Sequence, residues 1–414
     1  MEAVAEEKGF SPNLDEIDSA RLGEPDWLAA RRRAARERFE KLGFPTAKQE
    51  AWRYTSVGPI LDTPWRLDRG APGPAVRIEG KPKGVRVLRL AQALEEAPEL
   101  LAASLGDIAG AETNAFGALN QALAECVVVL LIERGAAPSA PIEILHDASG
   151  SEDPVVTYPR CLILAGERSQ ASVVERFTGH GTYFRSAVTE IALADGAVLD
   201  HDKLQQEGPS ARHVHTVAVR QARSSRFTSR NIALGAALAR TDLAVRLEGE
   251  GAECQLDGLF VGAGSQHLDT HTTIDHATPH TTSREVYKGI LDGRARGVFH
   301  GTIVVRPNAQ KTDAIQTNKN LLLSREALVN STPALEIFAD DVKCKHGSTI
   351  GQLDANALFY LRSRGIGEAE ARRLLTWAFA ADIAERIRIP SVRSEVERAL
   401  GQKLPGIPTP EVHP

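Results

Sequence analysis

Cys344 and His346 form the most closely spaced thiol and imidazole pair in a chain of 414 residues that contains four cysteines and twelve histidines. They belong to the stretch A-D-D-V-K-C-K-H-G-S-T-I-G, residues 339–351. Iron and zinc accept both side chains as ligands. On a β-strand the two residues share one face, about 6 to 7 Å apart along the backbone. Because a closed site needs about four ligands, the pair predicts half of a metal site; the alternative is a small buried cysteine beside a structural histidine.

A second group of candidate ligands lies between residues 267 and 280. These residue types suit zinc or iron and suggest, as an alternative function, a metal-dependent hydrolase. The group consists of His267, Asp269, His271, Asp275, His276 and His280.

The alternation of side chains along a β-strand tests whether the members of this group can share one face. The first three members share one face, and the opposite face carries Leu268, Thr270, Thr272 and Ile274, a pattern typical of an inward face. His276 and His280 fall on the other parity, so the four histidines converge only if the chain turns near residues 277–279. We therefore interpret the group as polar residues on the outer face of a strand. His213 and His215 receive the same interpretation.

The sequence lacks the signatures of several enzyme classes. Gly80 and Lys81 are followed by Pro82, so no phosphate-binding loop is present, and the chain is not expected to hydrolyse ATP by itself. Neither G-x-G-x-x-G nor the zinc peptidase and serine hydrolase motifs H-E-x-x-H and G-x-S-x-G occur. These absences remove the easily read signatures of nucleotide hydrolysis, dinucleotide binding, zinc peptidases and serine hydrolases.

The elements that must position these residues change character along the chain. Residues 126–350 contain many short alternating segments, such as Leu243, Val245 and Leu247 between polar neighbours, with Asp-Gly and Glu-Gly turns between segments. This pattern predicts an all-β body. A sandwich, a barrel and a β-solenoid fit the pattern, although so long a series of short strands without a long helix favours a stack of rungs. No strict repeat period is visible.

Helical segments flank the β body. Asp26 to Gly43 has a cap-like start and a glycine stop, and a helix that opens at Gly367 has apolar residues over more than one stripe. The wide apolar surface indicates packing on neighbouring helices and a partner protein. The sequence predicts four parts: a mostly helical segment at 1–120, a β core at 121–352, a helical segment at 353–403 and a disordered tail at 404–414.

Composition excludes several classes of partner. The chain is 42% hydrophobic and 25% charged with a net charge of -5, which gives no electrostatic reason to expect nucleic acid. The acidic start M-E-A-V-A-E-E-K lacks an apolar signal region, and no apolar run is long enough to cross a bilayer, so neither secretion nor a membrane span is expected. Widely spaced cysteines fit a reducing cytoplasm.

Several motifs together resemble a known family. They are F-P-T-A-K-Q-E-A-W-R-Y-T at 44–55, D-T-H-T-T-I-D-H at 269–276, Y-K-G-I-L-D-G at 287–293, F-H-G-T-I-V-V at 299–305, Q-T-N-K-N-L-L-L at 316–323, Y-L-R-S-R-G-I at 360–366 and A-R-x-L-L-x-x-A-F-A at 371–380. In this order they resemble the SufB/SufD family of iron-sulfur cluster assembly proteins. The form K-C-K-H-G-S-T-I-G is similar to the SufD branch rather than to SufB.

The resemblance implies a right-handed parallel β-helix core between N-terminal and C-terminal helical domains. It implies a scaffold that pairs with SufB through the end of the β-helix and carries the ATPase SufC on its C-terminal helices. His346, with Cys344 second, would be a ligand of a transient iron-sulfur cluster shared with SufB, and no cofactor would be bound stably by the lone chain. It leaves open whether the isolated chain forms a homodimer and whether the complex binds a flavin. A carbohydrate-active β-solenoid is the third candidate, and the acidic start opposes it.

Overall fold

The computed structural model describes residues 24–68, 73–109, 114–149 and 153–403. The tail at 404–414 that the sequence predicts to be disordered lies outside these residues. The N-terminal part is mostly helical and includes three short strands. Its elements are α2 (Asp26–Leu42), η1 (Glu50–Trp52), α3 (Gly58–Leu61), β1 (Arg66–Leu67), β2 (Ala75–Ile78), β3 (Val85–Arg89), α4 (Leu90–Glu96), α5 (Pro98–Ser104) and α6 (Ala115–Leu123).

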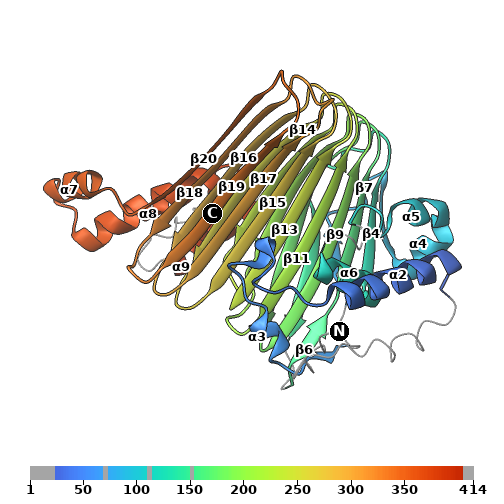
Figure 1. Cartoon of the computed structure of the whole chain (residues 1–414), viewed down its shortest axis with the longest axis horizontal. Helices are drawn as coiled ribbons and strands as arrows, with labels where there is room; N and C mark the ends of the chain where they lie inside the picture. Colours follow the sequence, from blue (N-terminus) through green and yellow to red (C-terminus); the bar gives the residue numbers. More distant parts are fainter. Residues whose placement is uncertain (1–23, 69–72, 110–113, 150–152, 404–414) are drawn as a thin grey trace.

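A long series of β-strands follows and forms the body of the molecule (Figure 1). The strands are β4 (Val127–Ile132), β5 (Ile142–Ser149), β6 (Val155–Thr157), β7 (Arg160–Ala165), β8 (Gln170–His180), β9 (Tyr183–Leu193), β10 (Val198–Gln205), β11 (Arg212–Gln221), β12 (Arg226–Ala233), β13 (Leu238–Leu247), β14 (Glu253–Gly262), β15 (His267–His276), β16 (Thr282–Leu291), β17 (Arg296–Val305), β18 (Asp313–Leu322), β19 (Leu328–Ile337) and β20 (Lys343–Gly351). Three helices end the described chain: α7 (Ala355–Ser363), α8 (Glu368–Ala384) and α9 (Pro390–Lys403).

The strands form a flattened parallel β-solenoid. From β8 onward, each turn gives one strand to each of two sheets: β9, β11, β13, β15, β17 and β19 lie in sheet A, and β8, β10, β12, β14, β16, β18 and β20 lie in sheet B. The predicted parallel β-helix with flanking helices is therefore confirmed. The number of residues per turn varies. For example, the turn that joins Phe227 to its partner Cys254 is shorter than the turn that joins Ser283 to its partner Ala314. This variation explains why no strict repeat is visible in the sequence.

Stacked aliphatic side chains fill much of the space between the sheets. One inward column of sheet A consists of residues in register on successive rungs, Ile191, Val219, Val245, Ile274 and Ile303. All five are buried. β-Branched residues suit such a column because their side chains are stiff and pack well on a pleated surface. The predicted inward parity of Leu243, Val245 and Leu247 is confirmed by their burial.

The early turns also bury charged and polar side chains between the sheets. Glu175 of β8 lies 2.8 Å from His146 Nε2, and His213 Nδ1 lies 2.8 Å from Glu207. His215 Nε2 lies 3.0 Å from Thr189 Oγ1. The interpretation of His213 and His215 as outer-face residues was therefore wrong: both are fully buried and face the interior, where Glu207 lies beside His213 and Thr189 beside His215.

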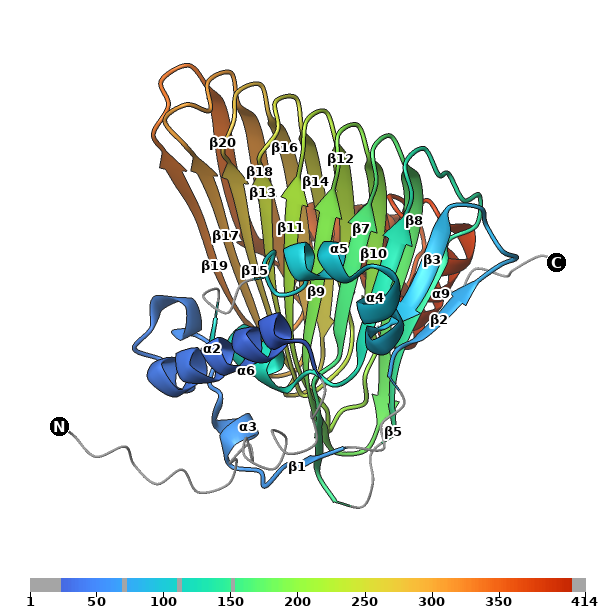
Figure 2. The same cartoon turned by 90° about the vertical axis from the view of Figure 1, so that its right-hand side faces the viewer.

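The N-terminal segment lies across the outer face of sheet A, where α6 contacts β9 and β11 and α2 packs on α6 (Figure 2). Trp52 and Thr55, both from the motif at 44–55, are buried there. The guanidinium of Arg240 lies 3.8 Å from the Trp52 ring centre, and the same group ion-pairs with Asp269. A cation over an aromatic face and a buried ion pair therefore fix this segment to the solenoid.

The C-terminal helices cover part of the outer face of sheet B. The second half of α8 and the whole of α9 bury Ala380, Ile383, Val392, Val396 and Leu400 against apolar residues of the sheet. In contrast, α7 has no buried residue and projects away from the solenoid (Figure 1). Across the described ranges, every helix is too short or too polar to cross a membrane.

Candidate functional site

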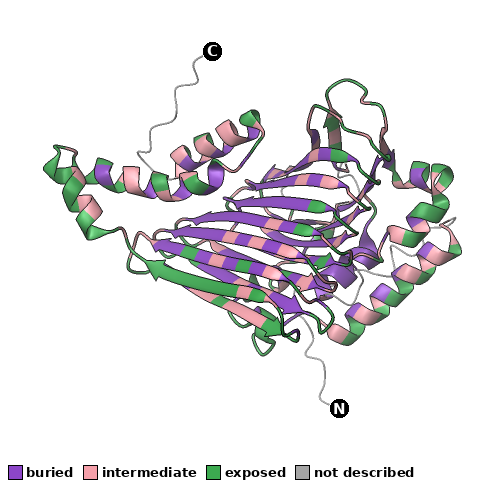
Figure 3. Ribbon diagram, turned by 90° about the horizontal axis from the view of Figure 1, so that it is seen from above, coloured by how far each residue is buried: buried purple, intermediate pink, exposed green. Residues whose placement is uncertain are grey.

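The solenoid ends in two exposed strands, β19 and β20. In the part of the chain that the structure describes, no strand pairs with the outer edge of either one, so their outward backbone groups lack sheet partners. Figure 3 shows the outermost strand exposed over almost its whole length. Large apolar side chains remain exposed on or beside these strands, namely Leu328, Ile337, Phe338 and Ile350. We call this surface the open end.

His346 lies on the inward-facing side of β20, in the middle of the open end. Its Cα partner on β18 is Gln316, which is buried, whereas His346 itself is exposed because no further turn covers it. Cys344 and Ser348 share this inward face, since alternate residues of a strand point the same way. The predicted common face of Cys344 and His346 is thus present, and it borders the interior of the last turn, which no further turn of the described chain covers.

Cys344 is less accessible than His346. It packs beside a small apolar cluster that includes Ile303, Val305 and Ala314. Burial raises the pKa of its thiol above the ordinary value, and a hydrogen bond with the Ala314 backbone opposes that shift. The isolated chain therefore holds Cys344 as a neutral thiol at neutral pH, and a bound metal would have to displace the proton.

Hydroxyl and amide side chains connect the last two strands to the interior. Ser348 Oγ on β20 lies 2.7 Å from Ser331 Oγ on β19, and Ser331 donates to Asn318 Oδ1 at 2.7 Å. The Asn318 amide in turn donates to the backbone oxygen of Tyr287 at 3.1 Å. This chain of hydrogen bonds joins the two sheets at the open end and holds the strand that carries His346.

The structure divides the ligand group at 267–280 between different surroundings. His267 and Asp269 lie beneath the N-terminal segment, 2.8 and 2.6 Å from Thr55 Oγ1. His276 is buried inside the solenoid, where Thr281 and Ser283 bond its two ring nitrogens at 2.8 and 3.0 Å. His280 occupies a turn with φ of 58°. The chain does turn after His276, but the four histidines do not meet, so the geometry does not support a hydrolase built on them.

Part of this group lines a cleft between sheet A and the N-terminal segment. The cleft has a volume of about 480 Å³, and the His271 and His300 rings stack there with centroids 5.0 Å apart. His271 Nε2 lies 3.1 Å from Asp269, and both nitrogens of His300 lie near threonine hydroxyls. Among the described residues, no group of three or more His, Cys, Asp or Glu side chains is arranged around a metal position.

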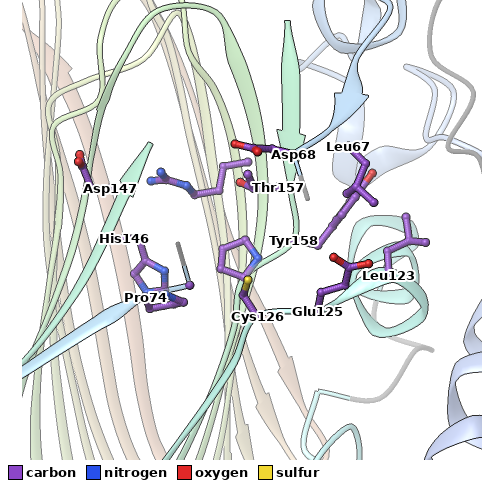
Figure 4. A pocket seen from close by; sticks show the side chains of 13 residues that line it. Leu67, Asp68, Pro74, Leu123, Glu125, Cys126, His146, Asp147, Thr157 and Tyr158 are labelled. Atoms are coloured by element: carbon purple, nitrogen blue, oxygen red, sulfur yellow. The ribbon is translucent and has the colours of Figure 1, made fainter. Parts of the chain in front are cut away.

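A smaller hollow lies near the other end of the solenoid (Figure 4). Its volume is about 40 Å³, which suits a few water molecules rather than a substrate. The Tyr158 hydroxyl and His146 Nδ1, which line it, have no hydrogen-bond partner within the described ranges, so water is the natural occupant. Burial and the neighbouring Glu125 raise the pKa of the Cys126 thiol in its wall, which disfavours a reactive thiolate.

Sequence reasoning missed the residues behind His346. Glu285 on β16 and Gln316 on β18 lie in register with His346 on the inward face of sheet B. Burial raises the pKa of Glu285 to about 7, although Gln316 and the nearby Thr272 hydroxyl oppose the shift. No sequence signal could have aligned these three residues, because the alignment depends on two turns of unequal length.

The exposed helix α7 offers a second apolar surface. Phe359 and Tyr360 are 73% and 56% exposed, although both are large aromatic side chains. Lys288 holds α8 to the sheet through an ion pair with Asp382, 2.7 Å away, so the base of this arm is fixed while its tip is free. Exposed aromatic residues on a projecting helix are typical of a protein interface.

Comparison with known proteins gives the family context of this fold. Residues 146–379 match the SufBD core domain of SUF system FeS cluster assembly, and residues 14–71 match the SufBD protein N-terminal region. The chain is 33% identical over 384 residues to the iron-sulfur cluster assembly protein SufD of Escherichia coli, which covers 88% of this chain and 90% of that protein.

Two further relatives carry the same family description. A SufBD family protein of Synechocystis, slr0076, is 34% identical over 69% of this chain and 65% of its own length. A SufBD family protein of Mycobacterium leprae, ML0594, is 30% identical over 87% of this chain and 90% of its own length. Together with the β-solenoid and the K-C-K-H-G stretch on its last strand, these matches show that the chain belongs to the SufB/SufD family, is of the SufD type and has a role in iron-sulfur cluster assembly.

Proposed function

We propose that this chain is a non-enzymatic scaffold subunit, which pairs with SufB through its open end and carries the ATPase SufC on its C-terminal helices. The observation that carries the proposal is the open end itself. It places His346 on an uncovered inward face and surrounds it with exposed apolar residues, among them Ile337 and Ile350. A second β-solenoid placed end to end would cover these residues and continue the stack.

The ligand set supports a site shared between two chains. His346 is an accessible imidazole, and Cys344 is a thiol two residues away on the same face. Two ligands hold a cluster incompletely, so SufB would supply the others, and the cluster would be transient cargo rather than a resident cofactor. In isolation, the same apolar surface would favour pairing with a second copy of this chain.

The helical arm supports the docking of an ATPase. The chain has no phosphate-binding loop, so energy for assembly would come from a partner. α7 presents Phe359 and Tyr360, and α8 links α7 to the sheet beside β14 and β16. Nucleotide-driven closure of two SufC subunits would pull on these arms and shift the paired solenoids toward a state that exposes the shared site, in the cytoplasm.

Copurification with tagged SufB and SufC tests this proposal. We expect Ile350→Asp to abolish copurification with SufB, because a carboxylate would then have to be buried at the interface, while SufC is retained. Leu100→Asp is the matched control, since Leu100 is an exposed apolar residue of α5, far from both surfaces in the sequence. Retention of SufB by the Ile350→Asp chain at the level of the unaltered chain would contradict pairing through the open end.

A further inference from the structure

Glu285 differs from every other buried carboxylate that the structure describes. Seven are buried, and six of them form ion pairs with arginine or histidine. Within the described ranges no basic side chain pairs with Glu285, which is 1% exposed. Burying a carboxylate without a counter-charge is costly, so such a group calls for a specific explanation.

The position of Glu285 relates it to the open end. Along one inward column of sheet B, Glu285 pairs with Gln316 and Gln316 pairs with His346, on three successive strands. Neighbouring strands are about 4.8 Å apart, so Glu285 lies roughly 10 Å behind His346. Only Gln316 stands between the buried carboxylate and the exposed imidazole in this column.

Two buried oxygen atoms of this column lack a hydrogen bond of normal geometry among the described residues. Gln316 donates from Nε2 to Glu285 Oε2 at 2.7 Å. Glu285 Oε1 and Gln316 Oε1 are both buried, and neither has a hydrogen bond of normal geometry among the described residues, although the Thr272 hydroxyl lies near enough to Glu285 to lower its pKa. Opposite them Gly301 leaves room for the amide, since a Cβ there would lie 2.3 Å from Gln316 Nε2. Because the open end is uncovered, rotation of Gln316 toward β20 would open a path to Glu285.

The last three turns lack internal positive charge. Lys203 and Arg185 are buried inside the early turns, but no inward position of β15 to β20 is lysine or arginine. Asn320 adds a third buried oxygen without a donor in the described structure, Oδ1. This end of the interior is therefore rich in hydrogen-bond acceptor oxygens and contains one carboxylic acid, Glu285. Such a composition attracts cations and repels anions such as sulfide.

We propose that Glu285 and Gln316 bind a divalent transition-metal cation that enters past His346. Carboxylate, amide and water oxygens accept hard and borderline divalent cations such as Mn²⁺ and Fe²⁺, and the His346 imidazole at the entrance favours the transition metals among them. The inference rests on the proposed function and deepens it, because it assigns iron, rather than sulfide, to this side of the shared site. Glu285 supplies the charge, Gln316 Oε1 the second protein ligand, and water the remaining ligands.

Anaerobic equilibrium dialysis of the isolated full-length chain against Fe²⁺ tests the inference at pH 7.5. We expect about one Fe²⁺ per chain and at least a tenfold weaker affinity for Glu285→Gln. Glu285→Asp, which keeps the charge, should retain more affinity than Glu285→Gln. The matched control is Glu336→Gln, which removes a carboxylate from the exposed outer side of β19 near the same end and should bind as the unaltered chain does.

Equal binding by Glu285→Gln and the unaltered chain would overturn the inference, and so would equal losses in Glu285→Gln and Glu336→Gln, which would indicate a general charge effect. Thermal unfolding of each variant checks that it is folded, and Glu285→Gln is nearly isosteric with the native residue. The test uses no partner protein. Its failure is therefore distinct from failure of the proposed function, which would appear in copurification with SufB and SufC.

Discussion

Thr55 donates a hydrogen bond of 2.6 Å to Asp269 Oδ2, across 214 positions of sequence. The same oxygen accepts from Arg240 Nη1 at 2.7 Å. Although burial raises it, Arg240 and His271 hold the pKa of Asp269 well below its ordinary value, so the carboxylate is charged at neutral pH. The N-terminal segment is therefore attached to the middle of the solenoid by a buried charged group.

Asp269→Asn should destabilise the chain by about 3 kcal/mol, because it leaves the buried Arg240 with one fewer counter-charge. Asp275→Asn makes the same change on the same face of β15, where its partner Arg306 is exposed, and should cost less than about 1 kcal/mol. Urea unfolding monitored by circular dichroism measures both. Similar losses for the two variants would contradict a specific anchoring role for Asp269.

Glu285 predicts an unusual dependence of stability on pH. Its folded-state pKa of about 7 lies above the unfolded value, so the folded chain binds a proton that the unfolded chain releases. This contribution to stability is full below about pH 4.5 and is lost as the pH rises through 7.

Glu285→Gln removes that loss, so the variant should be more stable than the unaltered chain at pH 8, by about 3 kcal/mol, and should show no such gain at pH 4.5. The difference in free energy of unfolding between the two chains, measured across this range without added metal, is the readout. A difference that does not change with pH would rule out titration of Glu285.

The arm residues Phe359 and Tyr360 should govern attachment of SufC. Replacing both with serine should weaken retention of the ATPase by about 2 kcal/mol or more, since exposed aromatics are common hot spots. Stability should change by less than about 0.5 kcal/mol, because neither side chain is buried. Point variants are preferable to a truncation before Asp354, which would uncover the apolar residues beneath α8 and α9. Unchanged retention would place the docking surface elsewhere.

His346→Ala should lower iron and sulfide loading of the assembled complex by about tenfold, as expected for loss of a ligand. Cys344→Ala should have a smaller effect, because the thiol is half-buried and its pKa is raised by that burial. His180→Ala, at another exposed histidine on the surface, is the control. Loading is measured by iron and acid-labile sulfide content after purification; unchanged loading of His346→Ala would remove this residue from the mechanism.

The alternation of apolar and polar residues was sufficient to predict the β core, since it identifies which residues share a face. It does not say which face is inside. His213 and His215 illustrate this limit, because their interior position depends on Glu207 and Thr189, which the fold brings to them. A polar residue is tolerated inside a solenoid only when such a partner exists, and strand pattern contains no information on partners.

The candidate site was predictable only in part. The spacing of Cys344 and His346 predicted their common face, whereas their role as ligands stays a prediction from the family resemblance. The predicted end of the β core at residue 352 made this stretch its last part, but nothing in the sequence says whether the following helices cover it, so the exposure of His346 could not be derived. The column through Gln316 to Glu285 was likewise hidden, because it depends on the exact lengths of two successive turns, which differ from each other.

The unpaired edges of β19 and β20 have a dynamic consequence. A stack of turns, in which each turn contacts only its neighbours, opens most easily at an end that is stabilised from one side alone. The strand that carries His346 should therefore fray more often than any internal strand of sheet B, and its amide hydrogens should exchange fastest. A second solenoid that pairs with this strand would slow the exchange of its amide hydrogens. Metal entry and pairing with the second solenoid would then both depend on the same opening of β20, so one would compete with the other.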